Sequence, residues 1–238
     1  MTTATAQSDT TTKLFELGGH LGHKKNRLHP KSRPFVYQII NGTSVIDLSK
    51  SVVQLDAALK LFQEIAKSEK HILIVGTKKV ASSILAEYAK NAGISYMTSK
   101  WLPGLLTNFE MIMKNVKKLQ TLKTQQADGE WEKFVKHERM KLAKELSKLD
   151  RLYGGILSLS KRPDYLFVVD IKKEKNAVKE AKQNNIPVIA MVDTNSNPQE
   201  VAFPIVVNDD APQVIDYVLS LVVDAYNKGK AARPVAAN

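Results

Sequence analysis

The sequence contains no cysteine in its 238 residues. This absence excludes disulfide bonds, cysteine nucleophiles and metal sites built on thiolates. Aromatic residues make up only 7% of the chain, and no apolar run reaches the roughly 18 residues that a transmembrane helix needs. The N-terminal sequence MTTATAQSDTTT lacks the basic and apolar regions of a signal peptide. We therefore expect a soluble, cytoplasmic protein with no membrane partner.

The motifs of common enzyme classes are also missing. The chain has no G-x-G-x-x-G, no G-x-x-x-x-G-K-[ST] and no G-x-S-x-G, the signatures of dinucleotide sites, P-loops and nucleophile elbows. In Val75–Lys79, VGTKK, a strand end, a glycine turn and a helix start could hold a phosphate on backbone N–H groups. A phosphate- or nucleotide-binding enzyme is therefore one alternative function, and a free-standing RNA-binding or adhesion protein is another.

Acidic residues are absent from a long stretch near the N-terminus, between Glu16 and Asp47. The whole chain carries a formal net charge of +11, and this stretch concentrates its basic residues, which are Lys24, Lys25, Arg27, Lys31 and Arg33. Three histidines, His20, His23 and His29, and two prolines, Pro30 and Pro34, lie among them. Charges of one sign repel unless a negative partner lies against them, and the commonest such partner is a phosphate backbone. The alternative is a solvated basic loop.

Apolar runs and amphipathic runs alternate along most of the chain. We expect strands at residues 35–40, 43–46, 71–75, 95–98, 165–169, 187–192 and 204–207. We expect helices at 51–67, 80–91, 175–184 and 211–226, the last with Asp210 as N-cap, and a tight turn at Asn41-Gly42. Continuous apolar strands separated by helices predict an α/β fold with a parallel sheet sandwiched between helices, of the flavodoxin or Rossmann type.

Residues 105–153 interrupt this alternation. Apolar residues recur every three or four positions on both sides of a turn at 125–130, which predicts an inserted antiparallel coiled-coil helical hairpin. Thr107 and Glu110 have the spacing of a capping box at its start. The rest of residues 12–228 (12–104 and 154–228) forms one α/β domain in this interpretation. Residues 1–11 are expected to be a disordered tail, and 229–238 a flexible one.

Several residues have both a functional and a structural interpretation. Asp170 and Asp193 could be paired carboxylates, but such residues more often cap turns and helices. His20 and His23, together with Asp193, Asp209 or Asp210, could hold a zinc ion, but two histidines without a recognisable third ligand are weak evidence. We therefore expect no metal, no cofactor and no catalytic residue. Trp101 is either a core residue or an exposed stacking residue.

Seven segments together resemble one known family. They are GGHLGHKKNRLHPK, FVYQIINGTSVIDLSK, ILIVGTKKVA, WLPGLLTNF, PDYLFVVD, IPVIAMVDTNSNP and VVNDDA. Their order and spacing over residues 13–228 resemble the second family of bacterial small-subunit ribosomal proteins. The match departs from the family pattern at Leu21, at Leu28-His29, at Pro103 and at Ser196-Asn197, and none of these departures removes a basic residue.

The resemblance implies a fold, partners and a role. The family has an α/β sandwich with a protruding helical hairpin, and its members are structural proteins of the small ribosomal subunit, not enzymes. They bind small-subunit ribosomal RNA and neighbouring ribosomal proteins, and they help to dock the large protein that recruits messenger RNA. Together with the basic stretch, the match predicts an RNA-binding set: His20, His23, Lys24, Lys25, Arg27, Lys31, Arg33, Lys78, Lys79, Lys100 and Asn108.

Overall fold

A computed structural model describes residues 2–233 of the chain and the side chains of residues 7–233. Its strands are β1 (Leu21–Lys24), β2 (Val36–Ile40), β3 (Thr43–Ile46), β4 (Ile72–Val75), β5 (Ser95–Met97), β6 (Tyr165–Val169), β7 (Val188–Val192) and β8 (Phe203–Val206). Its α-helices are α1 (Thr2–Glu16), α2 (Leu48–Lys67), α3 (Lys79–Ala92), α4 (Phe109–Ala127), α5 (Lys136–Tyr153), α6 (Lys175–Gln183) and α7 (Pro212–Ala231). The five 3-10 helices are η1 (Lys25–Arg27), η2 (Pro30–Phe35), η3 (Glu130–Lys133), η4 (Gly154–Ile156) and η5 (Pro198–Glu200).

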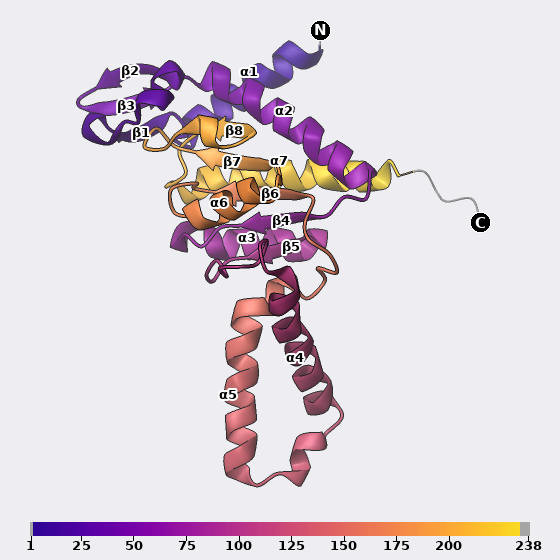
Figure 1. Cartoon of the computed structure of the whole chain (residues 1–238). Helices are drawn as coiled ribbons and strands as arrows, with labels where there is room; N and C mark the ends of the chain where they lie inside the picture. The colour runs from indigo at the N-terminus through magenta and orange to yellow at the C-terminus, as the bar shows by residue number, and fades with distance from the viewer. Residues whose placement is uncertain (1, 234–238) are drawn as a thin grey trace.

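The larger sheet is parallel throughout, in the order β5-β4-β6-β7-β8. Alternate side chains of its strands enter two separate apolar cores. Ile74, Phe167 and Ile189 pack with α2, α3 and α7 on one face, and Val75 and Val168 pack with α6 and α4 on the other. Helices thus cover both faces of the parallel sheet (Figure 1), which confirms the predicted α/β fold. Strands covered on both faces need apolar residues at every position, which explains the continuous apolar runs of the sequence.

A smaller antiparallel sheet, in the order β1-β3-β2, lies at the N-terminal end of the molecule, beyond β8 in Figure 1. Its β2–β3 turn is the predicted Asn41-Gly42 pair. Both residues have positive φ, 48° and 77°, which is the conformation that a two-residue hairpin turn requires and that Asn and Gly adopt most easily. This sheet carries the basic stretch of the sequence, because β1 leads directly into η1 and η2.

Helices α4 and α5 extend away from the β5 edge of the sheet and run side by side (Figure 1). Two ion pairs connect them, Lys118–Glu145 and Lys123–Asp150, the latter with 2.6 Å between Nζ and Oδ1. Helix α4 buries Val116, Leu119 and Leu122, whereas the buried residue of α5 is Tyr153 at its end. The two helices lie where the helical hairpin was expected. Its coiled-coil character stays a prediction, because α4 buries several apolar side chains along its length and α5 buries a side chain at its end.

Three local predictions are wrong. Residues 2–16 form helix α1 instead of beginning with a disordered tail. Buried Leu14 in its last turn and a 2.6 Å hydrogen bond from Gln7, in its first half, to Asp56 hold this helix in place. Helix α7 has Ala211, not Asp210, at its N-cap and runs to Ala231, so the expected flexible tail is helical at its start. Residues 234–238 of that expected tail lie outside the described residues.

The expected capping box at Thr107 is also absent, because Glu180 of α6 binds the loop before α4. Its Oε1 accepts hydrogen bonds from Trp101 Nε1 (3.0 Å) and from the Gly104 amide (2.9 Å). Its Oε2 accepts from the Leu106 amide (3.2 Å) and from the Thr107 hydroxyl (3.4 Å). Trp101 is therefore a core residue, only 5% exposed, whose indole N–H is satisfied from another element.

Replacement of Glu180 by alanine should lower the free energy of unfolding by about 2 kcal/mol, since several largely buried donors lose their common acceptor. Urea unfolding followed by circular dichroism measures the change. Glu200→Ala, which truncates an exposed glutamate, is the control and should shift the value by less than about 0.5 kcal/mol. Equal stability of the two variants would contradict the role of Glu180.

Candidate nucleic-acid interface and the acidic cluster beneath it

The predicted basic stretch forms an exposed surface that we call the basic segment, residues 21–35, made of β1, η1 and η2. Its five cationic side chains are all exposed. Within residues 7–233, none of the five forms an ion pair shorter than 4 Å. They are Lys24, Lys25, Arg27, Lys31 and Arg33. Exposed cations that make no close ion pair leave a positive field on one short segment, to which an anionic partner is attracted.

The basic segment is fixed to the loop that follows β7. The amide of His29 donates to the carbonyl oxygen of Thr194 (2.8 Å), the amide of His23 donates to the Thr194 hydroxyl (2.9 Å), and the buried Ser32 hydroxyl donates to the carbonyl of Ser196 (2.5 Å). A Cβ on Gly22 would lie 2.7 Å from the Thr194 side chain, so glycine permits this close approach. The basic segment is thus fixed by hydrogen bonds to the loop after β7 and is not a free loop.

Prolines and a local cap stiffen the segment further. Pro30 begins η2 and Pro34 lies inside it, and His29 caps it because its Nδ1 accepts a 3.2 Å hydrogen bond from the Lys31 amide. Proline fixes φ, so the unbound chain has less freedom to lose when it binds. The cations at Lys31 and Arg33 are therefore presented from a preformed backbone.

Beneath the segment, four aspartates follow the carboxyl ends of three parallel strands. They are Asp170 after β6, Asp193 after β7, and Asp209 and Asp210 after β8. Lys78, after β4, lies among three of them: its Nζ is 2.6 Å from Asp209 Oδ1, 2.6 Å from Asp210 Oδ1 and 3.3 Å from Asp170 Oδ2. We call Lys78 and the four aspartates the acidic cluster.

Charge and burial set the protonation of this cluster. Burial acts to lower the pKa of Lys78, but Asp209 and the other carboxylates outweigh it and raise that pKa, so the ammonium stays charged. Burial raises the pKa of Asp209 to about 7, with the nearby charge of Asp170 acting in the same direction and Lys78 opposing both. One ammonium thus holds together carboxylates that would otherwise repel one another.

His23 joins the basic segment to this cluster. Its Nδ1 lies 2.6 Å from Asp193 Oδ2, and its Nε2 lies 2.8 Å from the side-chain nitrogen of Asn195. The hydrogen bond to Asp193 raises the pKa of His23, while burial opposes it. Asp193 also accepts from the amide and the hydroxyl of Thr194, and Asp170 accepts from the Lys172 and Lys173 amides. Both aspartates therefore serve turns, as the structural interpretation predicts.

The remaining predicted site residues lie in different places. Lys79 is exposed at the start of α3, and Lys100 and Asn108 are exposed in the loop between β5 and α4, at the sheet edge opposite the basic segment. His20 stacks on Phe15 with the ring centroids 4.2 Å apart. Lys78 and His23 are bound by the protein's own carboxylates, which leaves them no free cationic group for a phosphate.

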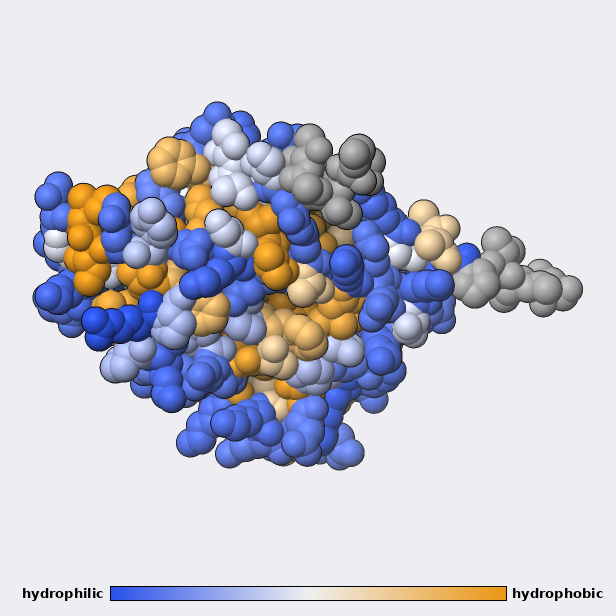
Figure 2. All heavy atoms as spheres, turned by 90° about the horizontal axis from the view of Figure 1, so that it is seen from above, coloured by the Kyte–Doolittle hydropathy of each residue, from blue (hydrophilic) through white to orange (hydrophobic). Residues whose placement is uncertain are grey.

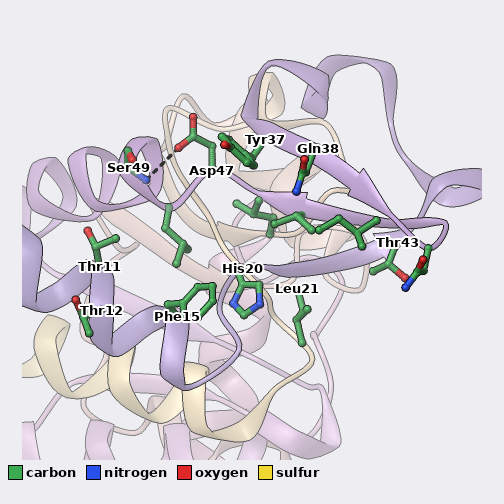
Figure 3. A pocket seen from close by; sticks show the side chains of 15 residues that line it. Thr11, Thr12, Phe15, His20, Leu21, Tyr37, Gln38, Thr43, Asp47 and Ser49 are labelled. Carbon is green, nitrogen blue, oxygen red and sulfur yellow. Dashed lines mark hydrogen bonds between the residues drawn. The ribbon is translucent and has the colours of Figure 1, made fainter.

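Sequence reasoning missed an apolar groove of about 790 Å³ beside the basic segment. Phe15 from α1, Leu21 from β1 and Tyr37 from β2 line it, with the start of α2 on the far side (Figure 3). Tyr37 is 73% and Phe15 59% exposed. Figure 2 shows apolar side chains gathered at this end of the molecule. The only signal in the sequence was the run VYQII, in which apolar residues occupy both faces of a hairpin strand.

The match to a protein family decides the class of this protein. A family model of ribosomal protein S2 matches residues 14–229. The chain belongs to the ribosomal protein S2 family. Members of this family are structural proteins of the ribosome and not enzymes. Among the residues that the structure describes, no helix has the length and apolar character to cross a membrane.

Curated relatives agree with this assignment. The small ribosomal subunit protein uS2 of Chlorobaculum tepidum is 42% identical over 212 residues, which are 89% of this chain and 85% of the relative. The protein of the same name from Dehalococcoides mccartyi is 42% identical over 213 residues, 90% of this chain and 87% of the relative. That of Parabacteroides distasonis is 38% identical over 217 residues, 91% and 78% of the two chains.

The structural role of Lys78 can be separated from a role in RNA binding by comparison with its neighbour. Lys78→Met removes the cation from the acidic cluster and should lower the free energy of unfolding by about 3 kcal/mol, because buried carboxylates lose their counter-charge. Lys79→Met, one residue further on and exposed, should change it by less than about 0.5 kcal/mol. Thermal and urea unfolding of the two variants measure this difference, and equal stability would rule out the structural role.

Proposed function

We propose that this protein is a structural component of the small ribosomal subunit and that it binds ribosomal RNA through the basic segment. The curated relatives are small-subunit proteins by name. The observation that supports RNA binding is the group of five exposed cations on a fixed segment, none of which forms a close ion pair within the described residues. Their common partner would be the phosphate backbone, which every RNA presents in regular spacing.

The mechanism is electrostatic positioning. Lysine and arginine contacts to phosphates orient a protein on RNA without reading its bases, and RNA helices are recognised largely by shape and by the sugar–phosphate backbone. A preformed basic segment suits this task because its cations keep a fixed spacing. The hydrogen bonds from His29 and Ser32 to the loop after β7 maintain that spacing.

The other predicted residues take different parts in this proposal. Lys79 is exposed and available for a phosphate, as predicted from the sequence. Lys100 and Asn108, at the opposite edge of the sheet, would contact RNA or a ribosomal protein through a second surface. His20, His23 and Lys78 support the basic segment and the groove instead of meeting phosphates, since their polar groups are engaged or enclosed within the protein.

The apolar groove is the surface that we assign to a protein neighbour. Phe15, Leu21 and Tyr37 offer apolar area and few hydrogen-bonding groups, which suits an apolar side-chain ridge better than a phosphate backbone. We propose that the large ribosomal protein that recruits messenger RNA docks an amphipathic segment here. RNA and this partner would then occupy adjacent surfaces, since Leu21 begins the basic segment and also lines the groove.

Charge reversal tests the RNA contact. The double variant Arg27→Glu, Lys31→Glu should abolish stable incorporation into the small subunit at physiological salt, because two phosphate contacts become repulsive. The measurement is the amount of tagged protein that co-sediments with small subunits.

A matched variant controls for the change in net charge. Lys60 and Lys67 are exposed on α2, whose C-terminal part lies far from the basic segment in Figure 1. Lys60→Glu, Lys67→Glu should incorporate normally. Normal incorporation of the Arg27→Glu, Lys31→Glu double variant would contradict the proposed contact between the basic segment and ribosomal RNA.

The groove is tested by removing its most exposed aromatic ring. Tyr37→Ser should reduce retention of the messenger-recruiting protein on purified small subunits at least fivefold while incorporation of the variant itself stays normal. Phe134→Ser, which removes an exposed ring in the segment between α4 and α5, is the control. Equal retention with both variants would contradict docking in the groove.

A further inference from the structure

The turn between β2 and β3 places two groups that can react with each other side by side. Asn41-Gly42 is the only asparagine followed by glycine in the sequence. Both residues are exposed, and a Cβ built on Gly42 would meet no atom within 4 Å. An asparagine carboxamide and the next main-chain nitrogen can close a five-membered ring, and glycine has no side chain to obstruct that approach. The carboxamide of Asn41 therefore lies next to an unobstructed nucleophile.

Neither of the two reacting groups is engaged by the fold. Within the part of the chain that the structure describes, the Asn41 side chain forms no hydrogen bond and the Gly42 main-chain N–H has no acceptor. Gly42 is held instead through its carbonyl oxygen, which accepts a 2.8 Å hydrogen bond from the Lys25 amide. A hydrogen bond to either reacting group would have to break before the ring could close, so the turn leaves the reaction without this barrier.

The charge of the basic segment favours the same reaction. Lys24 pairs with Thr43 across β1 and β3, and the Lys25 amide binds Gly42, so the basic segment begins directly beside the turn. Loss of the amide proton leaves a negative nitrogen, and its attack on the carboxamide leaves a negative oxygen. The positive field of the segment stabilises both anions relative to the neutral turn.

Asn185 provides a matched comparison within the same chain. It is exposed and has a positive φ of 54°, close to the 48° of Asn41. The residue after it, however, is Ile186, whose amide donates a 2.9 Å hydrogen bond to the carbonyl oxygen of Ala181. The β-branched side chain crowds that nitrogen, and the hydrogen bond holds its proton. The two asparagines thus share a backbone conformation and differ in the freedom of the nucleophile.

We propose that Asn41 is a site of spontaneous deamidation and that the modified turn weakens the binding of the basic segment to RNA. The Gly42 nitrogen loses its proton and bonds to Cγ of Asn41, the bond from Cγ to Nδ2 breaks, and ammonia leaves with that proton. A cyclic succinimide remains. Water then opens the ring: cleavage between the nitrogen and Cγ gives aspartate, and cleavage between the nitrogen and the main-chain carbonyl carbon gives isoaspartate.

Isoaspartate disturbs this turn more than aspartate does. It routes the main chain through the side chain and so lengthens a two-residue turn, whose geometry sets the pairing of Ile40 with Thr43. Strand β3 also pairs with β1, which leads into the basic segment. Both products add a carboxylate beside the cations, where it repels phosphate. The effect on RNA binding rests on the proposed function, whereas the reaction itself does not.

The reaction is tested by incubating the purified full-length protein at neutral pH and following each asparagine by peptide mass spectrometry for the mass gain of an amide-to-acid change. Asn41 should convert at least about tenfold faster than Asn185, because its nucleophile lacks both the β-branched side chain and the hydrogen bond. Part of the product should accept methyl groups from an isoaspartate methyltransferase. Asn41→Gln, which cannot form the five-membered ring, should remove this signal. Conversion of Asn41 no faster than that of Asn185 would overturn the proposal.

The effect on binding is tested by separating the isoaspartate form by chromatography and measuring its co-sedimentation with small subunits. It should incorporate about fivefold less than the unmodified protein, since both the register of the hairpin and the local charge change. Asn41→Asp adds the charge but keeps a residue pair that favours this turn, so it should incorporate better than the isoaspartate form.

Two outcomes separate this effect from the proposed function. Normal incorporation of the isoaspartate form, while Arg27→Glu, Lys31→Glu fails to incorporate, would overturn the effect of the modified turn and leave the RNA contact standing. Normal incorporation of both proteins would overturn the proposed RNA contact as well.

Discussion

The contact between Lys78 and the carboxylates at the end of the parallel sheet is the interaction on which the rest of this structure depends. A parallel sheet places the carboxyl ends of its strands at one edge, so Asp170, Asp209 and Asp210 meet there although they are up to 40 residues apart in sequence. Without a cation they would repel one another. Lys78, from the loop after β4, supplies that cation and joins the loops after β4, β6 and β8.

The same edge explains why this fold can be a scaffold. In open α/β sheets, enzymes bind ligands in the crevice outside the carboxyl ends of the strands. Here the chain's own groups occupy that region: Lys78 fills the space between the aspartates, and His23 brings the basic segment onto the loop after β7. At the edge where an enzyme of this fold would bind a nucleotide, this protein instead carries the basic segment with its exposed cations. The missing phosphate fingerprints of the sequence agree with this arrangement.

Local patterns predicted the elements well where the chain's own periodicity decides the structure. The strands at 43–46 and 165–169 have the predicted bounds, and the Asn41-Gly42 turn forms because both residues tolerate positive φ. Helix α1 was missed because its polar, threonine-rich sequence has little helical pattern, and contacts such as buried Leu14 hold it. The capping box at Thr107 failed for a similar reason, since Glu180, 73 residues away, takes its hydroxyl.

The candidate site was predictable only in part. The five exposed cations could be found because a gap in acidic residues is visible in any sequence. The burial of Lys78 could not be found, because a lysine beside a glycine turn looks like a phosphate ligand until distant aspartates are placed around it. The apolar groove depends on α1, β2 and the start of α2 meeting in space, and no single segment carries that information.

The most direct test of this account is to map the RNA crosslinks of the protein after sedimentation of a cell lysate on a density gradient. The account predicts co-migration with the small ribosomal subunit and crosslinks concentrated in residues 24–33, with none at Lys78. Migration as a free protein, or crosslinks in the small-subunit fraction that avoid the basic segment, would contradict it.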